Sequence, residues 1–139
     1  MLIMLIDGMG GGIGRSIADA LKKTHAAADI IAVGTNSNAT ANMMKAGISS
    51  AATGENSVIY MSAKADIIIG PIGIILPNSM YGEISPEMAV AVASSPAEKI
   101  LIPIQSGYVH IAGLLDKPLS QYVDEAVNIC LEILNRPVS

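Results

Sequence analysis

The chain opens with the stretch MLIMLIDGMGGGIGRS, residues 1–16, which joins an apolar run to a cluster of glycines. An unbroken apolar run such as residues 1–6 is typical of a strand that is covered on both faces of a parallel sheet. Apolar residues at helical spacing follow over residues 13–23. Glycine costs conformational entropy on folding, so a cluster of five within eleven residues needs a reason. The stretch therefore predicts a strand, a glycine-rich loop and a helix.

Strands and helices alternate along the rest of the chain. Only Gln105, Ser106 and Gly107 separate the apolar run 99–104 from the apolar run 108–115, which is too short for a parallel crossover, so the second run is expected to pair as an antiparallel hairpin. We expect a three-layer α/β fold, a single Rossmann-like domain over residues 1–139 with five mainly parallel strands and an antiparallel edge strand. The other strands are predicted at 29–34, 48–52, 66–70 and 99–104, and the other helices at 39–46, 55–65, 87–93 and 118–134.

Two helix starts carry a capping residue. Asn38 is expected to cap the helix 39–46, and Ser85, followed by Pro86, is expected to cap the helix that comes next after the fourth strand. The strand order stays open between 3-2-1-4-5, as in dinucleotide-binding folds, and 2-1-3-4-5, as in flavodoxin-like folds.

Composition and charge exclude several classes of function. The chain has no Phe or Trp, a net charge of −4 and eight basic residues that form no cluster, so no nucleic-acid partner is expected. The longest apolar candidate, residues 67–76, is about half the length of a membrane span and contains Gly-Pro, and the N-terminus lacks a basic region before its apolar run. We expect no membrane partner and a cytoplasmic location. Cys130, the single cysteine, lies in an apolar helical pattern and is expected to be a buried thiol.

The loops that follow the strands suggest a ligand site. In a parallel sheet, these loops meet at the carboxyl edge, where ligands bind next to the point at which the strand order reverses. The glycine loop leads directly into a helix, whose free N–H groups and positive dipole end favour phosphate. The predicted contacts for a small phosphorylated ligand are Asp7, Gly8, Gly10, Gly11, Gly12, Ile13, Gly14, Thr35, Asn36, Ser37, Gly70, Pro71, Gly73 and Asn78.

The spacing of the glycines distinguishes between nucleotide-binding motifs. G-x-G-x-x-G starting at Gly8 fails at its last position, which is Ile13, and the P-loop pattern fails at both its first Gly and its Lys. Residues 8–14 fit G-x-x-x-G-I-G, which resembles the nucleotide loop of short-chain dehydrogenases/reductases. That resemblance covers about fifteen residues and implies NAD or NADP as cofactor, with the pyrophosphate against the backbone near Gly12 and Ile13. The second predicted strand departs from dinucleotide binders, because neither an acid for the ribose nor an Arg follows it.

Two carboxylates near the predicted crevice have two interpretations each. Asp7 is interpreted first as an acceptor that organises the loop by binding its N–H groups, and alternatively as a magnesium ligand beside a nucleotide. Glu83 precedes a helix N-terminus, where a favourable charge–dipole contact explains it. If Glu83 instead projects into the crevice, it is the best candidate for a general base.

Several segments together resemble one protein family over nearly the whole chain. These segments are IDGMGGGIG, VGTNSNATANMMKAG, ATGEN, ADIIIGPIGI, NSMYGEISPEMA and KILIP. They are similar to a short bacterial family known as a domain of unknown function. The resemblance implies a complete chain rather than a fragment of a larger dehydrogenase, and it supplies no activity and no catalytic residue.

Two functions from different classes remain open at this point. The first is a module that binds an NAD(P)-type dinucleotide or another phosphorylated ligand without chemistry of its own. The alternative is a minimal NAD(P)-dependent oxidoreductase, with Asn78, Ser79, Tyr81 and Glu83 near its substrate and the substrate site completed by a dimer partner. A homodimer is expected because the predicted sixth strand and the last helix are apolar and can form an edge interface.

Overall fold

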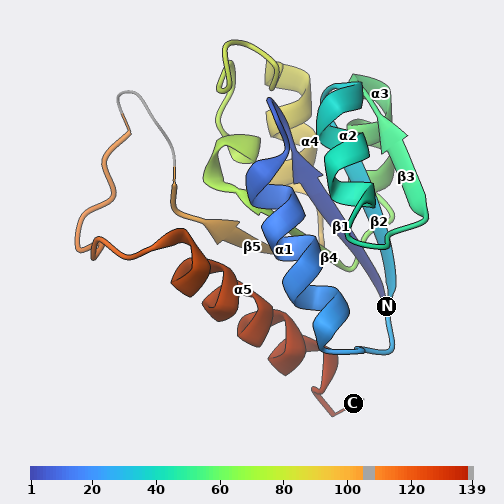
Figure 1. Cartoon of the computed structure of the whole chain (residues 1–139). Coiled ribbons are helices and arrows are strands. Elements are labelled where there is room, and N and C mark those ends of the chain that lie inside the picture. Colours follow the sequence, from blue (N-terminus) through green and yellow to red (C-terminus); the bar gives the residue numbers. More distant parts are fainter. Residues whose placement is uncertain (105–108, 138–139) are drawn as a thin grey trace.

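The computed structural model describes residues 1–104 and 109–137 and has the alternating α/β order that the sequence predicts (Figure 1). Its elements are β1 (Leu2–Asp7), α1 (Gly12–Lys23), β2 (Asp29–Gly34), α2 (Ser37–Met44), β3 (Ser50–Thr53), α3 (Glu55–Ser62), β4 (Ile67–Pro71), the 3-10 helix η1 (Ile72–Ile75), α4 (Pro86–Ser94), β5 (Glu98–Ile102) and α5 (Leu119–Leu134).

The sheet is parallel throughout, with the strand order β3-β2-β1-β4-β5. This is the first of the two orders that the sequence left open. Ile3 of β1 lies opposite Ile30 of β2 on one side and Ile67 of β4 on the other. The order therefore reverses between β1 and β4, which places the ligand-binding position of such sheets at the carboxyl ends of these two strands.

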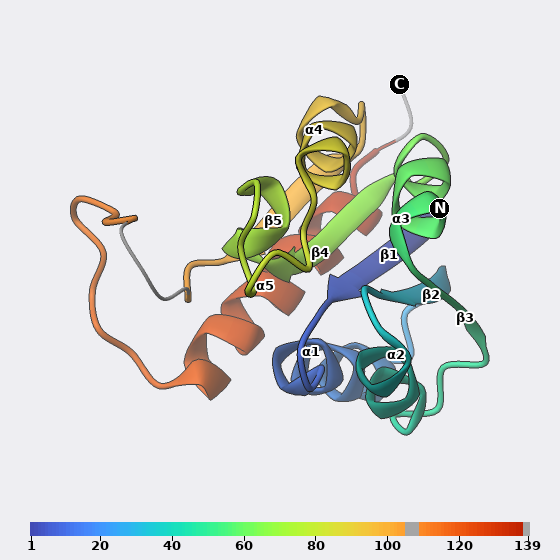
Figure 2. The same cartoon turned by 90° about the horizontal axis from the view of Figure 1, so that it is seen from above.

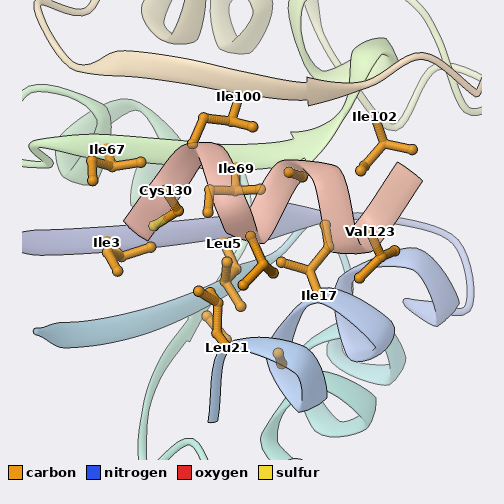
Figure 3. Close-up of a cluster of buried hydrophobic side chains, with 14 of the residues drawn as sticks. Ile3, Leu5, Ile17, Leu21, Ile67, Ile69, Ile100, Ile102, Val123 and Cys130 are labelled. Carbon is orange, nitrogen blue, oxygen red and sulfur yellow. The ribbon is translucent and has the colours of Figure 1, made fainter. Parts of the chain in front are cut away.

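Helices cover both faces of the sheet, which gives the three layers expected (Figure 2). Because side chains alternate along a strand, Ile3 and Leu5 of β1 point to one face, and Met4 and Ile6 point to the other. The face with Ile3 packs against α1 and α5, and the face with Met4 packs against α3 and α4. Figure 3 shows the first of these cores, with labelled side chains Ile3, Leu5, Ile17, Leu21, Ile67, Ile69, Ile100, Ile102, Val123 and Cys130.

Cys130 is fully buried in this core, as the apolar pattern of its helix predicts. In the described part of the chain, no helix is both long enough and apolar enough to cross a membrane.

The capping of α2 differs from the prediction. The N-cap is Asn36, not Asn38, and its side chain accepts a hydrogen bond from the Ala39 N–H at 2.9 Å. The helix starts earlier than expected because Asn36 is the extended residue that precedes the first helical residue, Ser37. The predicted cap of α4 is confirmed, since the Ser85 side chain accepts from the Met88 N–H and Pro86 is the first helical residue.

The predicted antiparallel edge strand is wrong for the residues that can be compared. Residues 109–115 contain a turn and no strand, whereas Gln105, Ser106 and Gly107 of the expected hairpin turn lie outside the described residues. Two features oppose a sixth strand. Pro103 follows the last residue of β5 and has no N–H to donate to a ladder, and Gly113 takes a left-handed φ of 79° inside the apolar run.

Candidate functional site

Asp7 organises the glycine loop at the end of β1. Its carboxylate accepts hydrogen bonds from the Gly8 N–H at 2.8 Å and the Gly14 N–H at 2.6 Å, and the side chain is buried. The acceptor interpretation of Asp7 is therefore confirmed. Among residues 1–104 and 109–137, no group of three or more His, Cys, Asp and Glu side chains is placed to hold a metal ion.

The ionisation of Asp7 reflects opposing influences. Burial raises the pKa of Asp7 above its ordinary value, and the nearby Glu83 carboxylate raises it further. The hydrogen bonds from Gly14 and Gly8 act in the opposite direction, because they favour the charged form. The carboxylate thus links the first turn of α1 to the end of β1 at an electrostatic cost.

Three glycines of the loop are required by packing within the protein. A Cβ on Gly8 would lie 2.7 Å from both Met80 Sδ and Thr35 Oγ1, and a Cβ on Gly14 would lie 2.6 Å from Met43 Sδ. Gly11 has a φ of 74°, and its Cβ would lie 2.8 Å from the Ala39 backbone. Real Cβ atoms are not found so close to other atoms, so these three positions need no ligand to explain them.

Gly10 and Gly12 are different, because a Cβ at either position would meet nothing within 4 Å. Both residues are exposed, and neither has a φ that demands glycine. Gly12 and Ile13 are the first two residues of α1, whose N–H groups have no acceptor inside the helix. The open part of the loop is thus a stretch of bare backbone at a helix N-terminus, which is a site suited to an anion.

The loop after β2 lies beside the glycine loop and holds it in place. The Asn36 side-chain amide donates to the Met9 carbonyl at 2.9 Å, and the Asn42 amide of α2 donates to the Gly10 carbonyl at 3.1 Å. Thr35 and Asn36 are half-buried, and Ser37 is exposed as the first residue of α2. The structure therefore brings the two predicted loops together, and it adds Asn42, which the sequence did not single out.

Glu83 reaches the same place from the connection between β4 and α4. Its Oε1 accepts hydrogen bonds from Thr35 Oγ1 at 2.5 Å, Asn36 Nδ2 at 2.8 Å and the Met9 N–H at 2.9 Å. Burial opposes its ionisation, but these three hydrogen bonds together lower the pKa of Glu83 below its ordinary value. The structure thus directs the Glu83 carboxylate at the loops after β1 and β2, and its role as a general base stays a prediction.

The predicted contacts after β4 have a different environment. Gly70, Pro71 and Gly73 are buried, and a Cβ on Gly70 would lie 2.4 Å from the Ile6 carbonyl oxygen. Gly70 thus lets β4 approach β1, so the packing of the sheet is enough to explain a glycine at this position. Asn78 is exposed and has a left-handed φ of 66°. The role of these four residues as ligand contacts stays a prediction.

Two hollows of the surface lie away from this site. One, of about 440 Å³, lies between β5, α5 and residues 113–117, and the other, of about 430 Å³, lies at the amino end of β1 and β2. Neither hollow is lined by the glycine loop, where Met80 and Glu83 occupy the space above Gly8. The candidate site is instead defined by the loop geometry, since the loop offers the N–H groups at the start of α1 beside the reversal of strand order.

The model of one protein family matches almost the whole chain. That family is described as Domain of unknown function (DUF3842), and the match covers residues 2–135. The chain belongs to the DUF3842 family. This confirms the expected resemblance to a family of unknown function.

The chain can also be compared with curated proteins and with solved structures. No curated protein matches it. Among solved structures, it is similar to the crystal structure of a dodecameric FMN-dependent UbiX-like decarboxylase from Escherichia coli O157:H7, with 13% sequence identity and a TM-score of 0.47. That alignment covers 99% of the DUF3842 chain and 95% of the other chain.

Proposed function

We propose that this DUF3842 protein binds a nucleotide or another small phosphorylated molecule at its glycine loop, with an NAD(P)-type dinucleotide as the ligand to test first. The observation that carries the proposal is the bare backbone at Gly10 and Gly12, where a Cβ would meet nothing within 4 Å. Packing does not require glycine at either position, so the approach of a ligand is the reason that remains.

The surroundings of these two glycines support an anionic ligand. The N–H groups of Gly12 and Ile13 lie at the start of a twelve-residue helix, where the helix dipole places about half a positive charge. The loop also lies at the carboxyl end of β1, beside the reversal of strand order. A phosphate oxygen at this point would accept hydrogen bonds from the N–H groups of Gly12 and Ile13, which have no acceptor inside the helix.

The test is a thermal-shift titration with NAD, NADH, NADP, NADPH, ATP, GTP, FMN and S-adenosylmethionine. A ligand at about 100 times its dissociation constant stabilises the protein by about 2.7 kcal/mol, which moves the unfolding midpoint of a chain of this size by about 8–11 °C. The matched variant is Gly12→Val, which fills the open space with a side chain and should abolish the shift. A panel in which no compound moves the midpoint would exclude the nucleotide proposal.

The oxidoreductase remains a second candidate, because the β4–α4 connection reaches the glycine loop through Met80 and Glu83. Tyr81 is 95% exposed and Asn78 is exposed, so a substrate has access to both. A partner chain would complete that site in a homodimer, for which the exposed Leu115 near β5 offers apolar surface. The two functions are separated by incubating the protein with NADH and small carbonyl compounds and measuring the absorbance of NADH, which falls only if the protein is an enzyme.

A further inference from the structure

Three hydrogen-bond donors converge on a single oxygen atom at the edge of the glycine loop. They are the Met9 N–H, the Thr35 hydroxyl and the Asn36 side-chain amide, and the atom on which they converge is Glu83 Oε1. The distances are 2.9, 2.5 and 2.8 Å respectively. Such an arrangement of donors stabilises an oxygen that carries negative charge.

The donors belong to one part of the molecule, and the acceptor belongs to another. Met9 lies in the loop after β1, and Thr35 and Asn36 lie in the loop after β2, and these two loops are already tied together by the bond from Asn36 to the Met9 carbonyl. Glu83 comes from the connection between β4 and α4, which lies above the end of β1 in Figure 1. The donor set is thus held by its own loops, with Glu83 bound to it from outside.

The segment that carries Glu83 closes over the loop in an uncommon backbone conformation. Asn78, Met80 and Tyr81 have φ values of 66°, 57° and 55°, in the left-handed region that residues other than glycine rarely adopt. Met80 Sδ lies 2.7 Å from the position of a Cβ on Gly8, so the segment lies directly on the loop. Among the described residues, the hydrogen bond from the Met9 N–H to Glu83 is the one that joins this segment to the glycine loop.

We propose that Met9, Thr35 and Asn36 form an anion site, and that Glu83 occupies this site as a substitute for the phosphate or carboxylate oxygen of a ligand. An anionic ligand that reaches the glycine loop takes these donors and releases Glu83 together with residues 78–82. The inference rests on the proposed function for the identity of the complete ligand, but the site itself is defined by its three donors.

Competition follows from the charges. The Glu83 carboxylate and a phosphate oxygen cannot both accept from the three donors, because two negatively charged oxygens in hydrogen-bond reach of the same donors repel each other. Glu83→Gln keeps the shape of the side chain, removes its charge and replaces charge-assisted hydrogen bonds by weaker neutral ones. Binding of an anion should therefore become about tenfold tighter in this variant.

The experiment is a calorimetric titration of the full chain with inorganic pyrophosphate. Glu87→Gln is the matched control, because it removes the same charge from an exposed residue in the first turn of α4. The expected result is about tenfold tighter binding for Glu83→Gln and no more than a twofold change for Glu87→Gln. Equal affinities in the two variants, weaker binding in Glu83→Gln, or no binding in either would overturn the anion site.

A second variant and a second readout keep the inference separate from protein stability. Thr35→Val removes one donor and should weaken the binding of pyrophosphate, whereas an unchanged affinity would contradict the site. Release of residues 78–82 is measured without any nucleotide, from the rate at which chymotrypsin cleaves after the exposed Tyr81. Cleavage should be faster in Glu83→Gln than in Glu87→Gln, and pyrophosphate should accelerate it in the wild type.

The two proposals fail in different ways. If pyrophosphate binds as expected and no compound of the nucleotide panel binds, the anion site stands and the nucleotide proposal falls. If a nucleotide binds and loses affinity in Gly12→Val, but Glu83→Gln binds pyrophosphate no more tightly than Glu87→Gln does, the glycine loop stands and the anion site falls.

Discussion

Substituting the glycines of the loop one at a time should separate those that serve packing from those that leave room for a ligand. The perturbation is alanine at position 11, 12 or 14, which adds one methyl group in each case. For Gly14→Ala, the new Cβ would lie 2.6 Å from Met43 Sδ and 2.8 Å from Asp7 Cβ. Overpacking of this kind costs about 1–3 kcal/mol, and the better helix propensity of alanine offsets about 0.5–1 kcal/mol of that cost.

These energies translate into measurable changes of the unfolding midpoint. An unfolding entropy of about 2.1 cal/mol/K per residue gives about 0.3 kcal/mol/K for this chain, so 1 kcal/mol corresponds to about 3–4 °C. The net cost of Gly14→Ala is up to about 2.5 kcal/mol, so the variant should lower the midpoint by up to about 9 °C. Gly11→Ala should lower it further, because its φ of 74° costs about 1–2 kcal/mol for a residue with a side chain and the clash is with Ala39 backbone atoms, which cannot rotate away.

Gly12→Ala should have the opposite effect. Its Cβ would lie in open space, so the only change is the smaller entropy loss of alanine, which stabilises the protein by about 0.4–1 kcal/mol and raises the midpoint by up to about 3 °C. The assay is differential scanning calorimetry of the wild type and the three variants at one pH. If Gly12→Ala loses as much stability as Gly14→Ala, Gly12 is packed against the protein, and the reasoning that leads to a ligand is refuted.

Three further predictions concern other parts of the molecule. Ser85→Ala removes the cap of α4 and should cost about 1 kcal/mol, or about 3–4 °C in the midpoint, whereas Ser94→Ala on the exposed end of the same helix should change little. Cys130, whose pKa is raised by burial to about 11, should not react with an aromatic disulfide reagent at pH 8 until the protein unfolds, and a fast reaction of the folded protein would contradict its buried position. The pKa of Glu83 is lowered in the folded protein, so its ionised carboxylate stabilises the fold above its ordinary pKa of about 4.3, and this stabilisation is lost as the pH falls through the folded pKa. The unfolding midpoints of the wild type and Glu83→Gln should therefore converge in acid. A difference between the two midpoints that stays constant down to pH 3 would refute this.

The strands could be predicted from the sequence because their signal is local. Residues 1–6, 29–34 and 66–70 are apolar runs that end in glycine or at a glycine loop, and each overlaps a strand to within one residue at either end. The sixth strand could not be predicted correctly, because apolar composition in residues 109–115 does not distinguish a strand from a loop. The cap at Asn36 was missed for a similar reason, since several small polar residues precede the helix and local pattern alone does not say which of them is extended.

The candidate site could be predicted only in part, because some of its contacts join residues that lie far apart in the sequence. The glycine loop and its link to Asp7 lie within eight residues, so the sequence shows both partners together. The contacts from Glu83 to Met9 and from Glu83 to Thr35 span 74 and 48 residues. The only signal for them was an acid in the connection after a central strand, which fits a helix dipole equally well. Likewise, Gly14 is packed against Met43 whereas Gly12 faces open space, and no spacing rule in the sequence connects Met43 to the loop.

The pairing of β1 with β4 has a consequence for how the chain is made. β2 follows β1 closely, but β4 begins at Ile67, sixty residues after β1 ends at Asp7. At a synthesis rate of about 5–20 residues per second, one edge of β1 waits about 3–12 s for its partner. That edge is an unpaired apolar strand during this time and can pair with another chain. Slowing translation ahead of residue 67 should therefore increase aggregation of the newborn protein, although the finished fold is unchanged.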